Sequence, residues 1–180
     1  ATTEIYYLPL HDALPISNHI NGVYGRDLLQ VLSSNATPST IYTANYGYDS
    51  YGRMGSVSSG VYSAIYGYVP NSDLLQSTTC ENNGATVLTT TRTWDYGYRL
   101  RSIANVANGT TVTSHSYLYD SLDRRFQATL EDGSIWKYSY NDRNELVGAH
   151  RFWSDWTPVA GQQYGYNFDN IGNRNTASWG

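Results

Sequence analysis

The chain has 180 residues, with 15 acidic and 11 basic side chains and a formal net charge of −4. Charged residues make up 14% of the sequence, well below the roughly 25% that is usual in globular domains. This weak acidity argues against nucleic acid as a main partner, and no apolar run approaches the roughly 20 residues of a membrane-spanning helix. Tyrosine is the outlier, with 18 residues beside 16 glycines, a mixture that favours strands and tight turns over helices.

Residues 1–17 differ in character from the rest of the chain. They read A-T-T-E-I-Y-Y-L-P-L-H-D-A-L-P-I-S and lack the Tyr-Gly pattern of residues 18–180. They closely resemble the in-frame translation of a sequencing-library adapter, from which they differ at Tyr7 and Pro9. We therefore expect this segment to be an artefact, and we exclude it from reasoning about the fold.

One repeated unit accounts for residues 18–180. It is clearest in Tyr46-Gly47-Tyr48-Asp49-Ser50-Tyr51-Gly52-Arg53, and its anchor positions are 23, 49, 69, 95, 120, 141 and 169, at steps of 26, 20, 26, 25, 21 and 28 residues. We expect an array of about seven units, the first of them truncated. The residues that carry the motif are Tyr46, Tyr48, Asp49, Gly52, Arg53, Trp94, Asp95, Arg99, Tyr117, Tyr119, Asp120, Arg124, Tyr138, Tyr140, Asn141, Tyr166, Phe168, Asp169 and Gly172.

The tyrosines of the unit are typical of strands. Tyr-x-Tyr occurs six times, at 46/48, 66/68, 96/98, 117/119, 138/140 and 164/166, and residues two apart share one face of a strand. Rings in neighbouring strands are expected to form cross-strand ladders. The pair at 96/98 comes after its aspartate instead of preceding it, which leaves its register open.

The Asp-x-x-Gly-Arg segment predicts a turn. An aspartate side chain accepts hydrogen bonds from backbone amides further along the chain, and glycine adopts the left-handed conformation that closes such a turn. Aspartate and arginine of one unit, such as Asp49 and Arg53, are placed to pair across the turn, and arginine also stacks well on tyrosine.

Second turns are expected between the units. The dipeptides Asn83-Gly84, Asn108-Gly109 and Asp132-Gly133 are typical of two-residue hairpin loops. Ser59-Gly60 and the stretch around Pro158 and Gly161 are expected to serve in the same way. The fold class is therefore all-β, with repeated antiparallel hairpins of about 14 strands forming a curved sheet, and Asp27 to Leu32 is the only segment where one helical turn is expected.

The sequence offers no constellation for catalysis. His19, His115 and His150 lack metal-ligand spacing, and Cys80 is the only cysteine. Carboxylates such as Asp123 are better explained as turn residues than as an acid–base pair. We expect neither an enzyme nor a bound metal or cofactor.

Aromatic side chains are the one plausible binding feature. Rows of tyrosine with the five tryptophans have two interpretations, packing between hairpins or stacking on sugar rings, and packing is the more frequent role. Trp153 and Trp156 lie outside the repeat pattern and are the candidate ligand-binding residues.

The repeat resembles the Rhs or YD-repeat family, which is named for its tyrosine–aspartate pair. The resemblance covers residues 23–178, and the most typical segments are Tyr117-Leu-Tyr-Asp-Ser-Leu-Asp-Arg-Arg, Asp132-Gly-Ser-Ile-Trp-Lys-Tyr-Ser-Tyr-Asn and Phe168-Asp-Asn-Ile-Gly-Asn-Arg. It implies a β-hairpin strip that coils into a hollow shell. In bacterial toxins of the family the shell encloses a C-terminal toxic domain, and in the animal teneurins a similar barrel belongs to an adhesion ectodomain.

The resemblance also implies a role, a location and partners. The family's shell-closing segment with its Asp-Pro-x-Gly signature is absent, so we expect an internal fragment of a longer protein, extracellular or at the bacterial cell surface. The expected function is the wall of a container for a toxin domain, and the expected partners are other repeats of the parent chain and the enclosed domain. The alternative is a surface carbohydrate-binding or adhesion module, with glycans as partners.

Overall fold

The computed structural model describes residues 5–6, 16–21, 27–33 and 40–180. These residues form strands and turns and contain no helix, which confirms the predicted all-β class. The chain divides into two compact units, residues 1–90 and 91–180, and the boundary lies within one strand, β8 (Ala85–Trp94). The predicted adapter segment, residues 1–17, falls largely outside the described residues.

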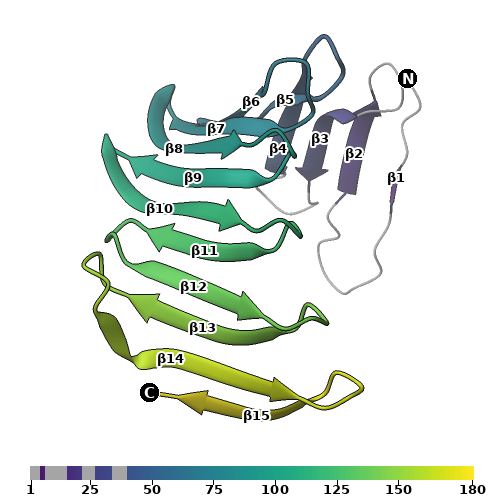
Figure 1. The fold of residues 1–180 in the computed structure, drawn as a ribbon. Coiled ribbons are helices and arrows are strands. Elements are labelled where there is room, and N and C mark those ends of the chain that lie inside the picture. The colour runs from purple at the N-terminus through teal and green to yellow at the C-terminus, as the bar shows by residue number, and fades with distance from the viewer. Residues whose placement is uncertain (1–4, 7–15, 22–26, 34–39) are drawn as a thin grey trace. The chain divides into compact units, whose positions relative to one another are not determined.

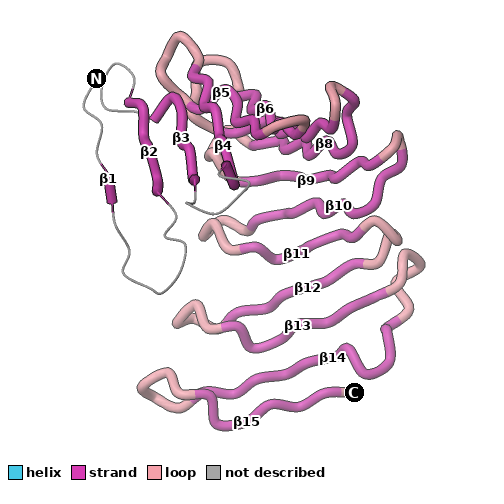
Figure 2. The backbone as a smooth tube through the Cα atoms, turned by 180° about the vertical axis from the view of Figure 1, so that it is seen from behind, coloured by secondary structure: helices cyan, strands magenta, loops and turns pink. Residues whose placement is uncertain are grey.

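In the first unit each strand from β1 to β6 pairs antiparallel with the next strand of the chain (Figures 1 and 2). Its strands are β1 (Ile5–Tyr6), β2 (Ile16–Asn21), β3 (Asp27–Ser33), β4 (Thr40–Tyr48), β5 (Met54–Ser59), β6 (Tyr62–Tyr68) and β7 (Leu75–Asn82). The helical turn expected at Asp27–Leu32 is wrong, because this segment lies in β3. Leu29 is paired on both sides, with Ile20 and Asn45, so strand pairing overrides the helix propensity of the leucines.

The second unit is also an antiparallel meander and has seven complete strands, which are drawn as successive rungs in Figure 1. All neighbouring pairs from β9 to β15 are antiparallel. The strands are β9 (Leu100–Ala107), β10 (Thr110–Tyr119), β11 (Arg125–Leu130), β12 (Ile135–Tyr140), β13 (Leu146–Phe152), β14 (Pro158–Phe168) and β15 (Arg174–Trp179).

Tyrosines alternate with small side chains on one face of the sheet. Tyr117 is directly opposite Ala128, and Tyr138 is opposite Ala149; both alanines are only 6% exposed. The expected ladder of tyrosines in adjacent strands is therefore wrong at these two places, because each ring faces an alanine of the next strand instead of a second tyrosine. The Trp136 and Tyr164 rings stack across the intervening strand β13, with centroids 6.0 Å apart.

The glycine of Tyr-Gly-Tyr is explained by packing on the face of the sheet opposite the tyrosine side chains. Gly47 lies directly across from Ser56, and Gly165 lies across from Ser178. A Cβ atom at Gly47 would be 2.5 Å from the Ser56 hydroxyl oxygen, and one at Gly165 would be 2.8 Å from the Ser178 oxygen. Glycine thus leaves room for a serine hydroxyl that packs against the neighbouring backbone, and a larger residue would force that hydroxyl to move.

The second turns confirm two of the hairpin predictions. Asn83 and Gly84 have positive φ values of 52° and 74°, and Asn108 and Gly109 have values of 50° and 76°, as a two-residue loop of this type requires. Asp132-Gly133 instead belongs to a three-residue loop, in which the Leu130 amide donates to the Ser134 carbonyl at 2.9 Å.

The turn expected around Pro158 and Gly161 is also displaced. Pro158 begins β14, and Gly161, with φ of 73°, lies inside that strand next to a change of register with β13. The loop itself is formed by Trp153–Thr157, since the Trp153 amide donates to the Thr157 carbonyl at 2.8 Å. Glycine at 161 therefore permits a bulge and not a hairpin loop.

Neither unit has a substantial buried core among its described side chains. The buried apolar residues of 43–180 are Ala44, Ala128, Ala149 and Val159. A sheet normally buries one face against a second layer. Contacts between neighbouring hairpins, such as those at the aspartate turns, therefore help to hold the described side chains in place.

Candidate functional site

The aspartate turns share one local geometry, which the first complete turn shows clearly. Asp49 Oδ1 accepts hydrogen bonds from the Tyr51 and Arg53 amides, both at 2.9 Å. The Asp49 amide donates to the Arg53 carbonyl at 2.9 Å, and Gly52 adopts φ of 77°. This is a three-residue hairpin loop whose last residue, Gly52, is left-handed, as the Asp-x-x-Gly-Arg pattern predicts.

The same loop recurs at every later anchor that carries aspartate or asparagine. Oδ1 of Asp95, Asp120, Asn141 and Asp169 accepts two backbone amides, two and four residues further on, at 2.9–3.0 Å. Glycine is not needed in every copy. The left-handed residues of the five turns are Gly52, Tyr98, Asp123, Asn144 and Gly172.

Three of the turns also contain an ion pair between aspartate and arginine, which confirms the predicted pairing. The Nε atoms of Arg53, Arg99 and Arg124 donate to Oδ2 of their own aspartates at 2.7–2.8 Å. The hydrogen bond from the Arg99 side chain, followed by that from its amide, holds the pKa of Asp95 below its ordinary value of 3.8. For Asp120, desolvation raises the pKa, but the hydrogen bonds from Arg124 and Leu122 outweigh it and the pKa is lowered.

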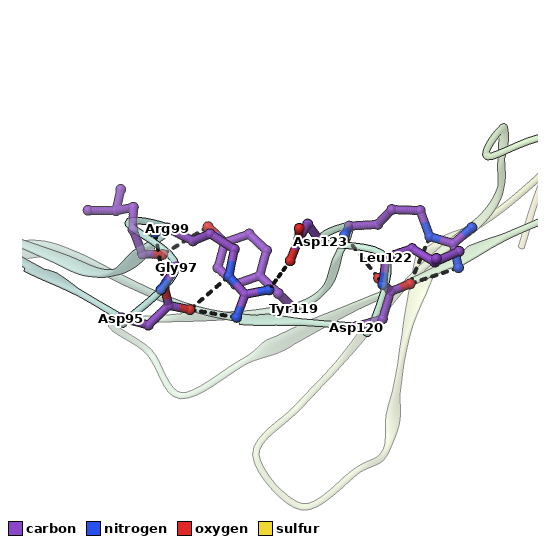
Figure 3. Close-up of polar contacts among 9 residues, drawn as sticks. Asp95, Gly97, Arg99, Tyr119, Asp120, Leu122 and Asp123 are labelled. Carbon is purple, nitrogen blue, oxygen red and sulfur yellow. Dashed lines mark hydrogen bonds and ion pairs between the residues drawn. The ribbon is translucent and has the colours of Figure 1, made fainter.

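The arginine of each such turn also reaches the next turn. Figure 3 shows Arg99 between Asp95 of its own turn and Asp123 of the next one, with Arg99 Nη1 2.5 Å from Asp123 Oδ1. Arg124 repeats this contact one step later, since its Nη1 donates to Asn144 Oδ1 at 2.8 Å. In the first unit, Arg53 Nη1 donates to the Ser72 carbonyl.

A tyrosine completes the contact between successive turns. The guanidinium carbons of Arg53, Arg99 and Arg124 lie 4.2–4.8 Å from the ring centroids of the next tyrosines, Tyr68, Tyr119 and Tyr140. Each tyrosine hydroxyl then donates to the carbonyl after that arginine, at 2.7–2.9 Å; these carbonyls belong to Met54, Leu100 and Arg125. We call the set of arginine, its own aspartate, the next tyrosine and the next turn the repeat clamp.

The final step departs from the repeat clamp in two positions at once. Glu145 replaces arginine and accepts from Asn141 Nδ2 at 2.6 Å. Arg143 takes over the contact with the next turn, donating from Nη2 to the Asp169 carbonyl at 2.6 Å and pairing with Glu145 at 2.9 Å. Phe168 stands where the earlier units have tyrosine, so the hydroxyl contact is absent from this step.

The structure places the predicted ligand candidates on the opposite hairpin ends from the repeat clamp. Trp153 and Trp156 begin and close one loop, through the hydrogen bond from the Trp156 amide to the Trp153 carbonyl at 2.9 Å. They are 47% and 52% exposed. The Trp156 ring already contacts Lys137 Nζ at 4.7 Å and the Phe152 ring at 6.0 Å, so a role in sugar binding stays a prediction.

The residues considered for catalysis do not come together. The His115 ring stacks near Tyr117 at 6.3 Å, and His150 Nδ1 lies 3.1 Å from Gln163 Oε1. His19 falls in β2, among residues whose side chains are not described. Within the described part of the chain, no group of three histidine, cysteine, aspartate or glutamate side chains is arranged to hold a metal.

Sequence reasoning missed a second polar cluster, centred on Arg151. Its Nη2 donates to Asp132 Oδ2 at 2.9 Å and to the Ser134 hydroxyl at 2.8 Å, and its Nη1 donates to Gln162 Oε1 at 3.2 Å. Ser134 is completely buried. No local sequence motif indicates this cluster, because its members lie on three different strands and loops.

The likeness to known proteins lies at the level of structure. No protein-family model matches the chain, and no curated protein matches it. Three crystal structures resemble it over more than nine-tenths of its length. The structure of TcdB2-TccC3-TEV matches with a TM-score of 0.72 and 16% sequence identity over 92% of the chain. That of TcdB2-TccC3-Cdc42 matches with a TM-score of 0.58 and 15% identity over 93% of the chain. That of TcdB2-TccC3 matches with a TM-score of 0.52 and 12% identity over 91% of the chain.

These similarities concern a small part of the larger proteins. The chain spans 9%, 8% and 12% of the three matched chains, respectively. No helix long and apolar enough to cross a membrane occurs in the part of the chain that is described. The likeness shows the fold, which is the Rhs-like, YD-repeat fold that the sequence motifs predict.

Proposed function

We propose that this chain is a segment of the wall of a β-shell that encloses a C-terminal toxin domain in a secreted or surface bacterial protein. The observation that carries the proposal is the repeat clamp. Arginine, aspartate and tyrosine make the same contacts at successive hairpins, as seen at Arg99 and Arg124. A sheet joined step by step in this way can extend to any length.

The small number of buried side chains favours the role of a wall segment and argues against a self-contained catalytic domain. An enzyme places its reactive groups on a rigid scaffold around a pocket, whereas the described residues here bury four apolar side chains. The aspartates with lowered pKa values are engaged by amides and arginines of their own turns. We assign these residues a structural role and no reaction.

Protection of the enclosed domain tests this proposal. The intact parent protein should resist protease at its C-terminal domain, and the double variant Arg99→Met/Arg124→Met should lose that resistance, because two successive steps of the wall lose their clamps. Arg174→Met is the matched control, since Arg174 stacks on Tyr166 at 5.7 Å within its own hairpin. The milder Tyr119→Phe variant keeps the test valid if the double variant does not fold.

Two results would overturn the proposal. If the C-terminal domain is cleaved in the intact protein as fast as when it is expressed without the repeats, the repeats do not enclose it. If the wall is intact by circular dichroism and the clamp variants protect equally well, the repeat clamp does not hold the wall together.

A further inference from the structure

Two hairpin loops contain asparagine followed by glycine, one loop in each unit. Asn83 and Asn108 are exposed, and neither side chain makes a hydrogen bond or ion pair with the described part of the chain. The wall function proposed above uses only the turn geometry of these residues. Their side-chain amides are therefore accessible and unrestrained.

An asparagine side chain can be attacked by the backbone nitrogen of the next residue. That nitrogen loses its proton and bonds to the side-chain carbonyl carbon, while the bond from this carbon to the amide nitrogen breaks and ammonia leaves. The product is a succinimide ring. One water molecule then opens the ring at either of its two carbonyl carbons, which gives aspartate or isoaspartate. This reactivity is one reason why asparagine is a thermolabile residue.

Glycine after the asparagine removes the main obstacle to ring closure. A side chain at that position would crowd the attacking nitrogen, and Gly84 and Gly109 have none. The space beside them is also open, because a Cβ atom at either glycine would meet no atom within 4 Å. The ring closes only when the loop leaves its left-handed geometry for a moment, and exposed loop tips open at low cost in free energy.

A third loop has aspartate followed by glycine and is protected by its contacts. Aspartate forms the same ring when its protonated carboxyl group loses a hydroxyl as water. Asp132 Oδ1 accepts the Ser134 amide at 2.8 Å, and Oδ2 accepts from Arg151 at 2.9 Å. The hydrogen bonds from Ser134, followed by the charge of Arg151, hold the pKa of Asp132 below its ordinary value of 3.8. The carboxylate therefore stays ionised and fixed in place beside Gly133.

Asparagines of the aspartate-type turns are restrained as well. Asn141 Oδ1 accepts two backbone amides, and Asn144 Oδ1 accepts from Arg124 at 2.8 Å. Neither asparagine is followed by glycine. These two residues serve as references within the same chain.

We propose that Asn83 and Asn108 are sites of spontaneous deamidation in the folded protein, and that the contacts of Asp132 protect the third loop. The aspartate product keeps the loop, since Asp-Gly suits the same turn, and adds one negative charge. The isoaspartate product lengthens the main chain by one carbon atom. At Asn108 this disturbs the pairing of Thr110 with Ala107 directly beside the loop, so modification loosens this end of the β9–β10 hairpin.

The test is peptide mapping by mass spectrometry after prolonged incubation of the full chain in neutral buffer. Peptides that contain Asn83 or Asn108 should gain about one mass unit, and an isoaspartate methyltransferase should label part of each product. Deamidation at both residues should be about tenfold or more faster than at Asn144, where a hydrogen bond to a charged group must first break. Asn83→Gly and Asn108→Gly keep the left-handed loop and should each remove the label at their own site.

Arg151→Gln tests the protection of the third loop. This variant should acquire isoaspartate at Asp132, whereas the wild-type chain should not. Arg174→Gln is the matched control, because Arg174 lies in β15, and it should leave Asp132 unlabelled. Circular dichroism verifies the fold of each variant, and the comparison of asparagines within the wild-type chain requires no variant.

Three results would overturn the inference. They are absence of deamidation at Asn83 and Asn108 in the folded chain, equal rates at these residues and at Asn144, or equal labelling of Asp132 in the wild type and in Arg151→Gln. The inference is independent of the wall function. Because the substituted residues lie outside the repeat clamp, failure here leaves the protease-protection result unchanged.

Discussion

Replacing Gly47 by alanine should destabilise the sheet, because the new Cβ would clash with one atom, the Ser56 hydroxyl oxygen. The new Cβ would lie 2.5 Å from the Ser56 hydroxyl oxygen but 3.7 Å from the Ser56 Cβ, so the hydroxyl must rotate or the strands must separate. Such overpacking costs about 1–3 kcal/mol, while alanine in place of glycine in a strand gains roughly 0.5–1 kcal/mol. The expected net loss in the free energy of unfolding is about 0–2.5 kcal/mol, with a central value of roughly 1 kcal/mol.

The serine offers a direct control for this reasoning. In Gly47→Ala/Ser56→Ala the nearest remaining contact is an ordinary one, so the double variant should be at least as stable as Ser56→Ala alone. The coupling free energy in the double-mutant cycle should be about 1–3 kcal/mol, measured by urea unfolding followed by circular dichroism. A double variant as unstable as Gly47→Ala would refute the claim that the serine hydroxyl is what requires glycine.

Three further outcomes are expected, each from a different part of the turns. Tyr119→Phe should lower the free energy of unfolding by roughly 1 kcal/mol in urea titrations, because the Leu100 carbonyl loses its hydrogen bond at 2.9 Å; an unchanged midpoint would contradict this. The pKa values of Asp95 and Asp120 are lowered in the folded protein. Their contribution to stability is therefore present above their ordinary pKa of 3.8 and is lost as the pH falls through the lower, folded-state values. Thermal midpoints should decline only in strong acid and not between about pH 5 and 7. Tyr98→Gly should raise stability by about 0.5–1 kcal/mol by removing the left-handed strain, and a fall in the thermal midpoint would show that the tyrosine ring contributes more than its backbone costs.

The turns were predictable because their chemistry is local. The aspartate of each turn, such as Asp49, accepts hydrogen bonds from backbone amides that lie within five positions of it. The residues that form the turn are therefore next to one another in the sequence and can be recognised there. Glycine is expected at the left-handed position on the same grounds, and Gly52 and Gly172 satisfy this expectation. Tyr98 breaks the pattern, because strain at one turn is tolerated when the surrounding strands fix the backbone.

Contacts between hairpins were less predictable because they depend on register. The pairing of Arg99 with Asp123 joins residues 24 positions apart, and neither residue is marked by its own neighbourhood as a partner of the other. The loop near Pro158 was misplaced for a related reason. Proline and glycine are typical of turns, but Gly161 serves a bulge that matches β14 to β13, and a bulge is visible only once both strands are aligned.

The most direct test of the wall function is the structure of the intact parent protein by electron cryo-microscopy. We expect residues 43–180 to form part of a continuous β-sheet wall around a lumen that contains the C-terminal domain, with Arg99 and Arg124 joining successive hairpins of that wall. A parent in which these repeats form an open, solvent-filled strip, with the C-terminal domain folded outside them, would contradict the central claim.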